Sequence, residues 1–171
     1  MGRTKSDIAN SALRIFLQDV GKFYDSARGY EPYIPKKTQK TILLENFSYK
    51  CCYCDTEINE QTLSQDHLIP MNKASLGLHA WGNVVPCCID CNNEKQQRHW
   101  DEFLRMKVQG KLYQKKKKKI DDFVKKMQYD PTLNLHKYAY NLYEDIGEVA
   151  LTLIKLRYKQ AEKEIKKVIR K

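Results

Sequence analysis

The sequence predicts an α+β fold in which a small core of short strands, stapled by metal-binding cysteines, is embedded in a mostly α-helical chain. Apolar residues recur at helical spacing on both sides of residues 51–91, that central stretch carries only short strand signals, and a Cys-x-x-Cys pair stands at each of its ends. A chain of 171 residues is long enough for one domain or for a small core with helical arms. We therefore expect a helical flank over 1–46, a core over 47–105 and a basic helical region over 106–171.

The N-terminal flank should contain two helices. Thr4 is followed three residues later by Asp7, which is the spacing of a capping box and predicts a helix start. This helix should end near Gly21 or Gly29. Its apolar face is expected at four positions: Ile8, Ala12, Phe16 (or Ile15) and Val20. A stiff connector with two prolines follows, and a second helix is expected over 38–47.

The remaining elements follow from the pattern of apolar residues. Short strands are expected over 62–68 and 84–85, and helices over 92–105, 111–128 (one helix or a pair) and 136–170. The last helix is amphipathic, with one apolar side formed by Leu142, Ile146, Val149, Leu153 and Leu156. We expect this side to pack against the first helix of the chain, and dimerisation through it is the alternative.

The net charge of +10 is distributed unevenly along the chain. Residues 1–50 carry +4, residues 51–100 carry −3 and residues 101–171 carry +9. A polyanionic partner is therefore expected, held by the basic flanks while the acidic centre has another task. No apolar run is long enough to cross a bilayer and no secretory signal is visible, so we expect no membrane association and a cytoplasmic, reducing location.

The six cysteines favour metal binding, because a reducing cytoplasm does not maintain disulfides; a secreted protein with three disulfides is the alternative. Cys51 and Cys54 form one Cys-x-x-Cys pair, and Cys88 and Cys91 form the other. Two thiolates from each of two tight turns complete the tetrahedral four-sulfur site that structural Zn²⁺ prefers. The other two cysteines are expected to be spare, and a further alternative is that all six are small buried apolar residues. A closed zinc site has no free coordination position, so the chemistry is expected elsewhere.

Polar residues between and after the cysteine pairs form a second candidate site. The insert holds Asp66-His67-x-x-Pro and Gly-Asn83-Val-Val-Pro, and Asn92 follows the last cysteine. Taken singly, a histidine is usually a surface residue and an asparagine before a helix is usually an N-cap. Taken together, a hairpin over 62–86 would bring these side chains to one place. Carboxylate and amide oxygens suit Mg²⁺ or Mn²⁺, and a neutral imidazole beside the ion can act as a base. Because adjacent strand residues point to opposite faces, the strand must end or twist at Asp66 and His67.

At these residues the chain resembles the HNH endonucleases, whose core is a ββα-metal finger. The resemblance covers residues 47–95 and rests on four motifs in the family's order: C-x-x-C, D-H-x-x-P, G-N-V-V-P and C-x-x-C-N-x-x-K. It implies that His67 activates water for attack on the scissile phosphate and that Asp66 and Asn92 bind the catalytic metal. It also implies that Asn83 holds the loop that orients the base, and that hydrolysis leaves 5′-phosphate and 3′-hydroxyl ends. Many members have histidine at position 92. With an amide oxygen there, we expect Mg²⁺ or Mn²⁺ to outperform Zn²⁺ or Ni²⁺ in catalysis.

Lysines after the core are expected to contact phosphate. The strongest basic stretch, with Lys111 on the same predicted helix, is Lys115, Lys116, Lys117, Lys118 and Lys119. The alternative is a lysine-rich face that is merely solvated. Lys95 is expected either to contact phosphate or to be a solvated helix lysine. His79 and His99 fall on no motif position and are further candidates for metal ligands.

The sequence therefore predicts a metal-dependent endonuclease acting on double-stranded DNA, with restriction or phage defence as suitable roles. It could act as a homodimer or with a partner protein. Two alternatives stay open: a non-catalytic zinc module that binds nucleic acid, and a nuclease that cuts RNA or works only with a partner subunit. Asp66, His67 and Asn92 together favour the enzyme, because a binding module needs none of them.

Overall fold

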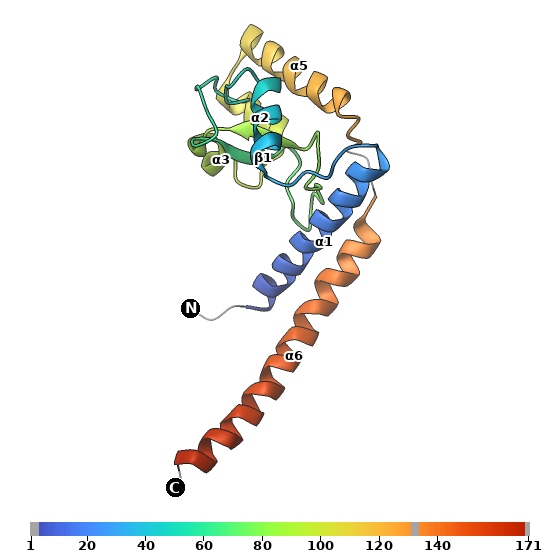
Figure 1. The fold of residues 1–171 in the computed structure, drawn as a ribbon, viewed down its shortest axis with the longest axis vertical. Helices are drawn as coiled ribbons and strands as arrows, with labels where there is room; N and C mark the ends of the chain where they lie inside the picture. Colours follow the sequence, from blue (N-terminus) through green and yellow to red (C-terminus); the bar gives the residue numbers. More distant parts are fainter. Residues whose placement is uncertain (1–3, 131–133, 170–171) are drawn as a thin grey trace.

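The α+β fold class is confirmed in a computed structural model that describes residues 4–130 and 134–169. Two antiparallel strands lie among helices (Figure 1). The elements in chain order are α1 (Lys5–Ala27), α2 (Lys37–Asn46), β1 (Ser64–His67), β2 (Val84–Cys87), α3 (Ile89–Lys95), α4 (Trp100–Lys107), α5 (Gly110–Lys126) and α6 (His136–Ile169). No helix among these described residues is long and apolar enough to cross a membrane.

Helix α1 begins where its sequence predicts, but its fully buried row is displaced by one position from the predicted one. The Thr4 side chain accepts a hydrogen bond from the backbone of Asp7, and the Asp7 carboxylate accepts one from the backbone of Thr4. The helix runs through Gly21 and ends before Gly29, whose φ of +81° suits a residue without a side chain. The predicted apolar face is partly buried: Phe16 and Val20 pack against a hydrophobic core, whereas Ile15, the alternative to Phe16, is 59% exposed. The buried row is one position further on: Ala9, Leu13, Leu17, Gly21 and Asp25.

The buried row of α1 contains a glycine and an aspartate because both fix the helix to the centre of the chain. A Cβ at Gly21 would lie 2.4 Å from the backbone oxygen of His79, so only glycine permits this approach. The fully buried carboxylate of Asp25 accepts hydrogen bonds from the backbone of Tyr33 (2.8 Å) and Trp81 (3.1 Å) and pairs with Arg28 (2.6 Å). Apolar periodicity detects neither residue, which explains the displaced prediction.

The two strands and helix α3 form a ββα unit. Asp66 pairs with Val85 and His67 with Val84, and the strands are joined by the long segment 68–83. Helix α3 begins two residues after β2 ends. The single helix predicted over 92–105 is wrong. Helix α3 ends at Lys95, and Gln96 takes a φ of +53°. The backbone amide of Trp100 then donates a hydrogen bond to the backbone oxygen of Leu68 (3.0 Å).

Two hydrophobic cores hold the molecule together, and each draws on all three predicted regions. The larger core joins Tyr33 and Leu43 to Val85 and to Phe123 of α5. The smaller core joins Leu13 and Leu17 of α1 to the segment 76–80 and to Tyr129 and Ala139. The division at residues 46 and 105 therefore stays a prediction about function, because packing crosses both boundaries.

Helix α6 lies antiparallel to α1, which confirms the predicted pairing of the first and last helices (Figure 1). Leu142 and Ile146 are partly buried there. The helix then continues past the start of α1, and Val149, Leu153 and Leu156 are 50–53% exposed. Dimerisation through this half of α6 stays a prediction.

Candidate active site and zinc centre

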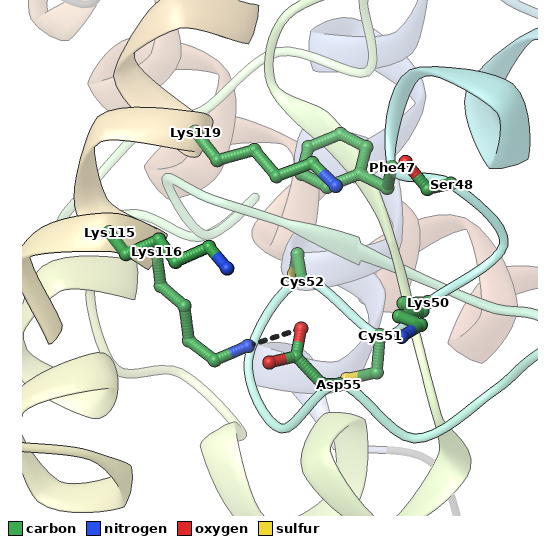
Figure 2. Close-up of a pocket in the computed structure, with 9 residues that line it drawn as sticks. All are labelled: Phe47, Ser48, Lys50, Cys51, Cys52, Asp55, Lys115, Lys116 and Lys119. Carbon is green, nitrogen blue, oxygen red and sulfur yellow. Dashed lines mark ion pairs between the residues drawn. The ribbon is translucent and has the colours of Figure 1, made fainter. Parts of the chain in front are cut away.

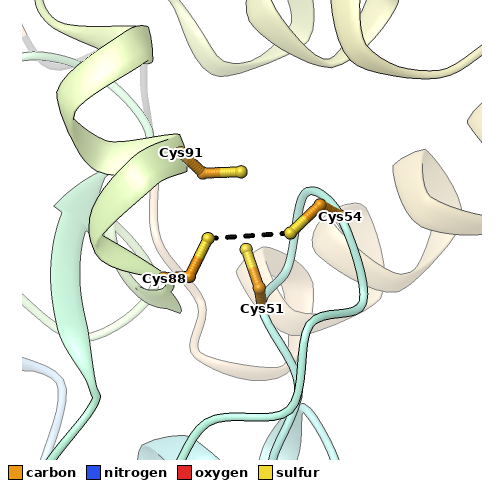
Figure 3. A group of neighbouring side chains, drawn as sticks. All are labelled: Cys51, Cys54, Cys88 and Cys91. Carbon is orange, nitrogen blue, oxygen red and sulfur yellow. Dashed lines mark hydrogen bonds between the residues drawn. The ribbon is translucent and has the colours of Figure 1, made fainter.

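The two Cys-x-x-Cys pairs come together at one point, as Figure 3 shows. Cys51 and Cys54 stand on a tight turn closed by hydrogen bonds from the Cys51 amide to Thr56 (2.8 Å) and from the Asp55 amide to Cys51 (3.1 Å). Cys88 is the N-cap of α3 and Cys91 lies in its first turn.

The four sulfurs fit a structural zinc ion. All four Sγ atoms lie within 4.8 Å of one another, and those of Cys54 and Cys88 are 3.6 Å apart. A tetrahedral ion with Zn–S bonds of about 2.3 Å places its sulfurs about 3.8 Å apart. The cluster therefore has the donor set and the spacing of a closed four-thiolate zinc site. Such a site joins the turn 51–54, the zinc knuckle, to the start of α3.

The other two cysteines lie outside the four-sulfur cluster. Cys52 and Cys87 are both buried, and burial raises the pKa of each thiol. The Cys87 thiol donates to the backbone oxygen of Ser64. Both residues stay neutral at ordinary pH and pack in the larger core.

Asp66 is buried and held by two partners. Its Oδ2 accepts a hydrogen bond from the Tyr53 hydroxyl (2.6 Å), and its Oδ1 accepts one from Nζ of Lys95 (3.1 Å). Burial raises the pKa of Asp66, while the positive charge of Lys95 and the two hydrogen bonds lower it. Each carboxylate oxygen keeps a second lone pair, so the group can still bind a cation.

Lys95 lies in the interior, so its prediction as a solvated lysine is wrong. Its side chain is fully buried, and its amine donates to Asp66 and to the backbone oxygen of His67 (2.8 Å). A phosphate contact by Lys95 stays a prediction, and its observed contacts give it another task, the placement of Asp66.

In the motif C-x-x-C-N-x-x-K, the asparagine and the lysine have the spacing needed to contact two residues on one face of strand β1. Asn92 and Lys95 are three residues apart on α3 and so share one face of the helix, while Ser64 and Asp66 are two apart on β1 and share one face of the strand. Nδ2 of Asn92 donates to Oγ of Ser64 (2.8 Å), just as Lys95 donates to Asp66. The hydrogen bond leaves Oδ1 of Asn92 available as an acceptor.

His67 forms a pair with His79. Nε2 of His67 lies 2.9 Å from Nδ1 of His79, and the His79 ring packs edge-on against Tyr33. Burial, with positive charge from His79, Lys95 and Arg14, lowers the pKa of His67 to about 3. The imidazole is therefore uncharged at neutral pH. With Nε2 directed at His79, Nδ1 is the nitrogen left for chemistry.

Asn83 closes the segment between the strands. Its buried amide accepts from the backbone of Ile69 (2.8 Å) and donates to the backbone oxygens of Ile69 (3.0 Å) and Leu78 (2.7 Å). A Cβ at Gly77 would lie 1.8 Å from the oxygen of Ile69, so glycine is needed for this closure. These contacts hold the segment that carries His79 against the end of β1.

One pocket collects three of the four predicted catalytic residues, and Asn83 does not line it. Asp66, His67 and Asn92 line it, together with Pro70, Met71 and four glutamines and one arginine: Gln18, Gln65, Gln96, Gln97 and Arg14. Asp66 and His67 share this pocket although they are adjacent, because β1 ends at His67 and the alternation of faces ends there. His99 does not line it.

Several residues of this site carry no signal in the sequence. Arg14 and Gln18 come from α1, one position after the buried Leu13 and Leu17. A correct buried row would have placed them at its edge, but their distance along the chain from His67 hides the contact. Tyr53 stands on no motif position, and only the fold reveals its contact with Asp66. His79, a candidate metal ligand by sequence, lies against His67 in the structure.

The lysines of α5 face several directions. Lys116 is buried and pairs with Asp55 (2.7 Å), while Lys117 and Lys118 pair with the aspartates one turn further on, Asp121 (2.9 Å) and Asp122 (2.6 Å). The expectation of a uniformly solvated or phosphate-facing stretch is therefore wrong for Lys116. Lys111 is exposed near the start of the helix.

A second pocket lies between α5 and the zinc knuckle, and its lining is basic. Lys115 and Lys119 reach into it from α5, opposite Lys50 and Phe47, as Figure 2 shows. Nζ of Lys119 lies 5.4 Å from the centre of the Phe47 ring, and Asp55 is the acidic residue among those that line the pocket. Burial and the neighbouring charges of Lys116 and Lys50 lower the pKa of Lys119. An anion bound here would relieve this repulsion.

Residues 51–108 match the family model for HNH endonucleases. The matched segment contains the cysteine cluster, the hairpin, α3 and α4, whereas α1, α2, α5 and α6 lie outside it. The chain therefore contains an HNH endonuclease domain, which confirms the resemblance seen in the sequence. A domain of this family indicates a nuclease that binds nucleic acid. No curated protein matches the chain.

Proposed function

We propose that the protein is a metal-dependent HNH endonuclease that hydrolyses the phosphodiester bonds of double-stranded DNA. The observation that supports this most is the shared pocket, where Asp66, His67 and Asn92 meet although they come from β1 and α3. The HNH domain supports nuclease chemistry, and the net charge of +10 supports a polyanionic substrate. Restriction or phage defence is the role that we propose for it.

His67 is the proposed general base. If its Nε2–H donates to Nδ1 of His79, the lone pair of its Nδ1 is free to accept a proton from water. The water oxygen then bonds to phosphorus, and the bond from phosphorus to the 3′ oxygen breaks. The 3′ oxygen leaves with the bonding electrons and takes a proton from solvent, and His67 returns its proton to solvent, so the products carry a 5′-phosphate and a 3′-hydroxyl. His79 acts as a positioning residue that selects the tautomer of His67.

Asp66 and Asn92 are the proposed ligands of a catalytic Mg²⁺ or Mn²⁺, which supplies electrostatic stabilisation for the charge that develops on the phosphate. Their oxygens suit such an ion, and their partners hold them in place. Lys95 and Tyr53 fix the carboxylate, and Ser64 turns the amide so that its oxygen remains available. The four cysteines hold a separate structural Zn²⁺.

The basic pocket beside the zinc knuckle is proposed to bind the nucleic-acid backbone away from the cut. Lys50, Lys115 and Lys119 supply its positive charge. Lys111, Lys117 and Lys118 would add weaker contacts, since the last two already pair with aspartates.

The test is plasmid cleavage with added Mg²⁺ or Mn²⁺, comparing the wild type with His67→Ala. We expect metal-dependent cutting by the wild type and a loss of about 10²–10⁴-fold in the variant, because a general base contributes about that much. The matched control is His136→Ala, which removes an exposed histidine at the start of α6 and should cut as the wild type does.

Unchanged cutting by His67→Ala would refute the assignment of the base. A folded, zinc-loaded wild type that cuts neither DNA nor RNA with either metal would leave a module that only binds nucleic acid. Metal dependence is best tested by omitting Mg²⁺ and Mn²⁺, since a strong chelator also removes structural zinc.

A further inference from the structure

The candidate catalytic pocket has a wall that the HNH domain does not supply. Arg14 and Gln18 line it from α1, whereas the family match begins at residue 51. Arg14 and Gln18 are one turn apart and so share one face of the helix. The wall is firmly placed, because Gly21 packs on the backbone of His79 and Asp25 is tied to Trp81.

Among the described residues that line this pocket, Arg14 is the one lysine or arginine. It is one of the groups whose positive charge reaches His67. The buried Lys95 lies behind Asp66 and is already paired with it. The pocket therefore presents to an incoming phosphate one exposed cation, which stands on the side that α1 forms.

Arg14 also differs from the other arginines over residues 4–130 and 134–169. Arg28, Arg98, Arg105 and Arg157 each donate to a protein oxygen. Within the same described residues, no hydrogen bond, ion pair or ring contact engages the guanidinium of Arg14. Its side chain is exposed and lines the pocket, so its donors are available to a ligand there.

We propose that Arg14 binds the phosphate that is cut, so that helix α1 completes the active site of the HNH domain. The planar guanidinium can donate two parallel hydrogen bonds to the non-bridging oxygens of a phosphodiester. Asp66 and Asn92 lie in the same pocket, so a phosphate held by Arg14 is placed beside His67. This inference rests on the nuclease function proposed above.

The inference is tested by three variants in the full-length, zinc-loaded protein: Arg14→Gln, Arg14→Lys and, as the matched control, Arg157→Gln. Arg157 is exposed on the far half of α6, so its replacement makes the same chemical change away from the pocket. We expect kcat/KM for plasmid cleavage to fall about 10²–10³-fold in Arg14→Gln, because one donor to a developing oxyanion contributes about that much. Arg14→Lys should recover part of this loss, since it keeps the charge without the paired donors.

A second readout does not depend on cutting. Each substitution is placed in His67→Ala protein, and binding of a short DNA duplex is followed by fluorescence anisotropy over a range of salt concentrations without added Mg²⁺ or Mn²⁺. Loss of one phosphate contact should flatten the slope of log Kd against log salt by about one. A role of Arg14 in folding alone would leave this slope unchanged.

The outcomes separate the two proposals. Cutting by the wild type together with equal cutting and an equal salt slope in Arg14→Gln would overturn the role of Arg14 and leave the nuclease standing. A wild type that cuts no nucleic acid would overturn the nuclease and, with it, a scissile phosphate for Arg14 to bind. Losses confined to Arg14→Gln, with normal behaviour of Arg157→Gln, support the inference.

Discussion

At the scale of single residues, the site depends on buried polar side chains that are held in place by hydrogen bonds. Asp66 is the clearest case, because a buried carboxylate is stable only when hydrogen-bonded and paired. Tyr53 and Lys95 satisfy it, and neither residue could be assigned this role from the sequence. Lysine is almost never fully buried, so Lys95 was expected at the surface. Its position in the N-x-x-K motif predicts the shared helix face with Asn92, but not the burial.

The pairing of Lys95 with Asp66 leads to a stability prediction. Lys95→Met should lower the free energy of unfolding by about 3–5 kcal/mol, because removal of one partner leaves an uncompensated buried charge. The exposed Lys111 offers a control, and Lys111→Met should change stability by less than about 0.5 kcal/mol. Urea denaturation followed by circular dichroism measures both. Equal stability of the two variants would mean that Asp66 does not depend on Lys95.

At the scale of elements, α1 is part of the functional centre as well as a flank. Its start and length follow from the capping box and from Gly29. Its buried face could not be predicted, because Gly21 and Asp25 are buried for contacts with the segment 79–81 that only the fold creates. The same limit applies to α3 and α4. Nothing in the sequence 92–105 signals that Gln96 takes a positive φ so that Trp100 can return to Leu68.

The close approach of α1 to His79 predicts an unusual response to alanine. Gly21→Ala should destabilise the protein by about 1–3 kcal/mol, because the new Cβ would meet the backbone oxygen of His79. Cutting should also fall, since His79 moves with that backbone and positions His67. Replacing a glycine in a helix interior by alanine normally raises the stability of a protein by up to about 1 kcal/mol.

Gly147 of α6 is the matched control for Gly21. A Cβ there would lie 2.7 Å from Cγ of Lys5, a side chain that can shift more easily than a backbone oxygen, so Gly147→Ala should destabilise the protein less than Gly21→Ala and should cut normally. Urea denaturation and plasmid cleavage compare the two variants. A Gly21→Ala protein that is more stable than the wild type and equally active would show that α1 does not press on His79.

At the scale of the whole molecule, the zinc cluster and the hydrophobic packing form one system. The spacing of Cys51, Cys54, Cys88 and Cys91 is a local pattern, and it predicts the cluster because each pair sits on its own turn. The same is true of the HNH motifs around it. The pocket wall from Arg14 and the two cores that cross all three regions depend on long-range packing, which no local pattern encodes.

Loss of the zinc should therefore disturb more than the knuckle. Cys51 and Cys91 belong to the larger core, which also holds Phe47 and Phe123, so Cys88→Ser should remove the ion and unfold this core with it. The matched control is Cys87→Ser, whose hydroxyl can still donate to Ser64 and whose zinc content should stay at about one ion per chain. Elemental analysis and thermal melts measure both effects.

Because α1 and α6 pack on the segment 76–80, their helical signal should melt together with the core in one transition. A Cys88→Ser protein that is zinc-loaded and melts like the wild type would refute the structural role of the cluster. If the larger core unfolds in Cys88→Ser while α1 and α6 stay folded, the two helices are stable without that core.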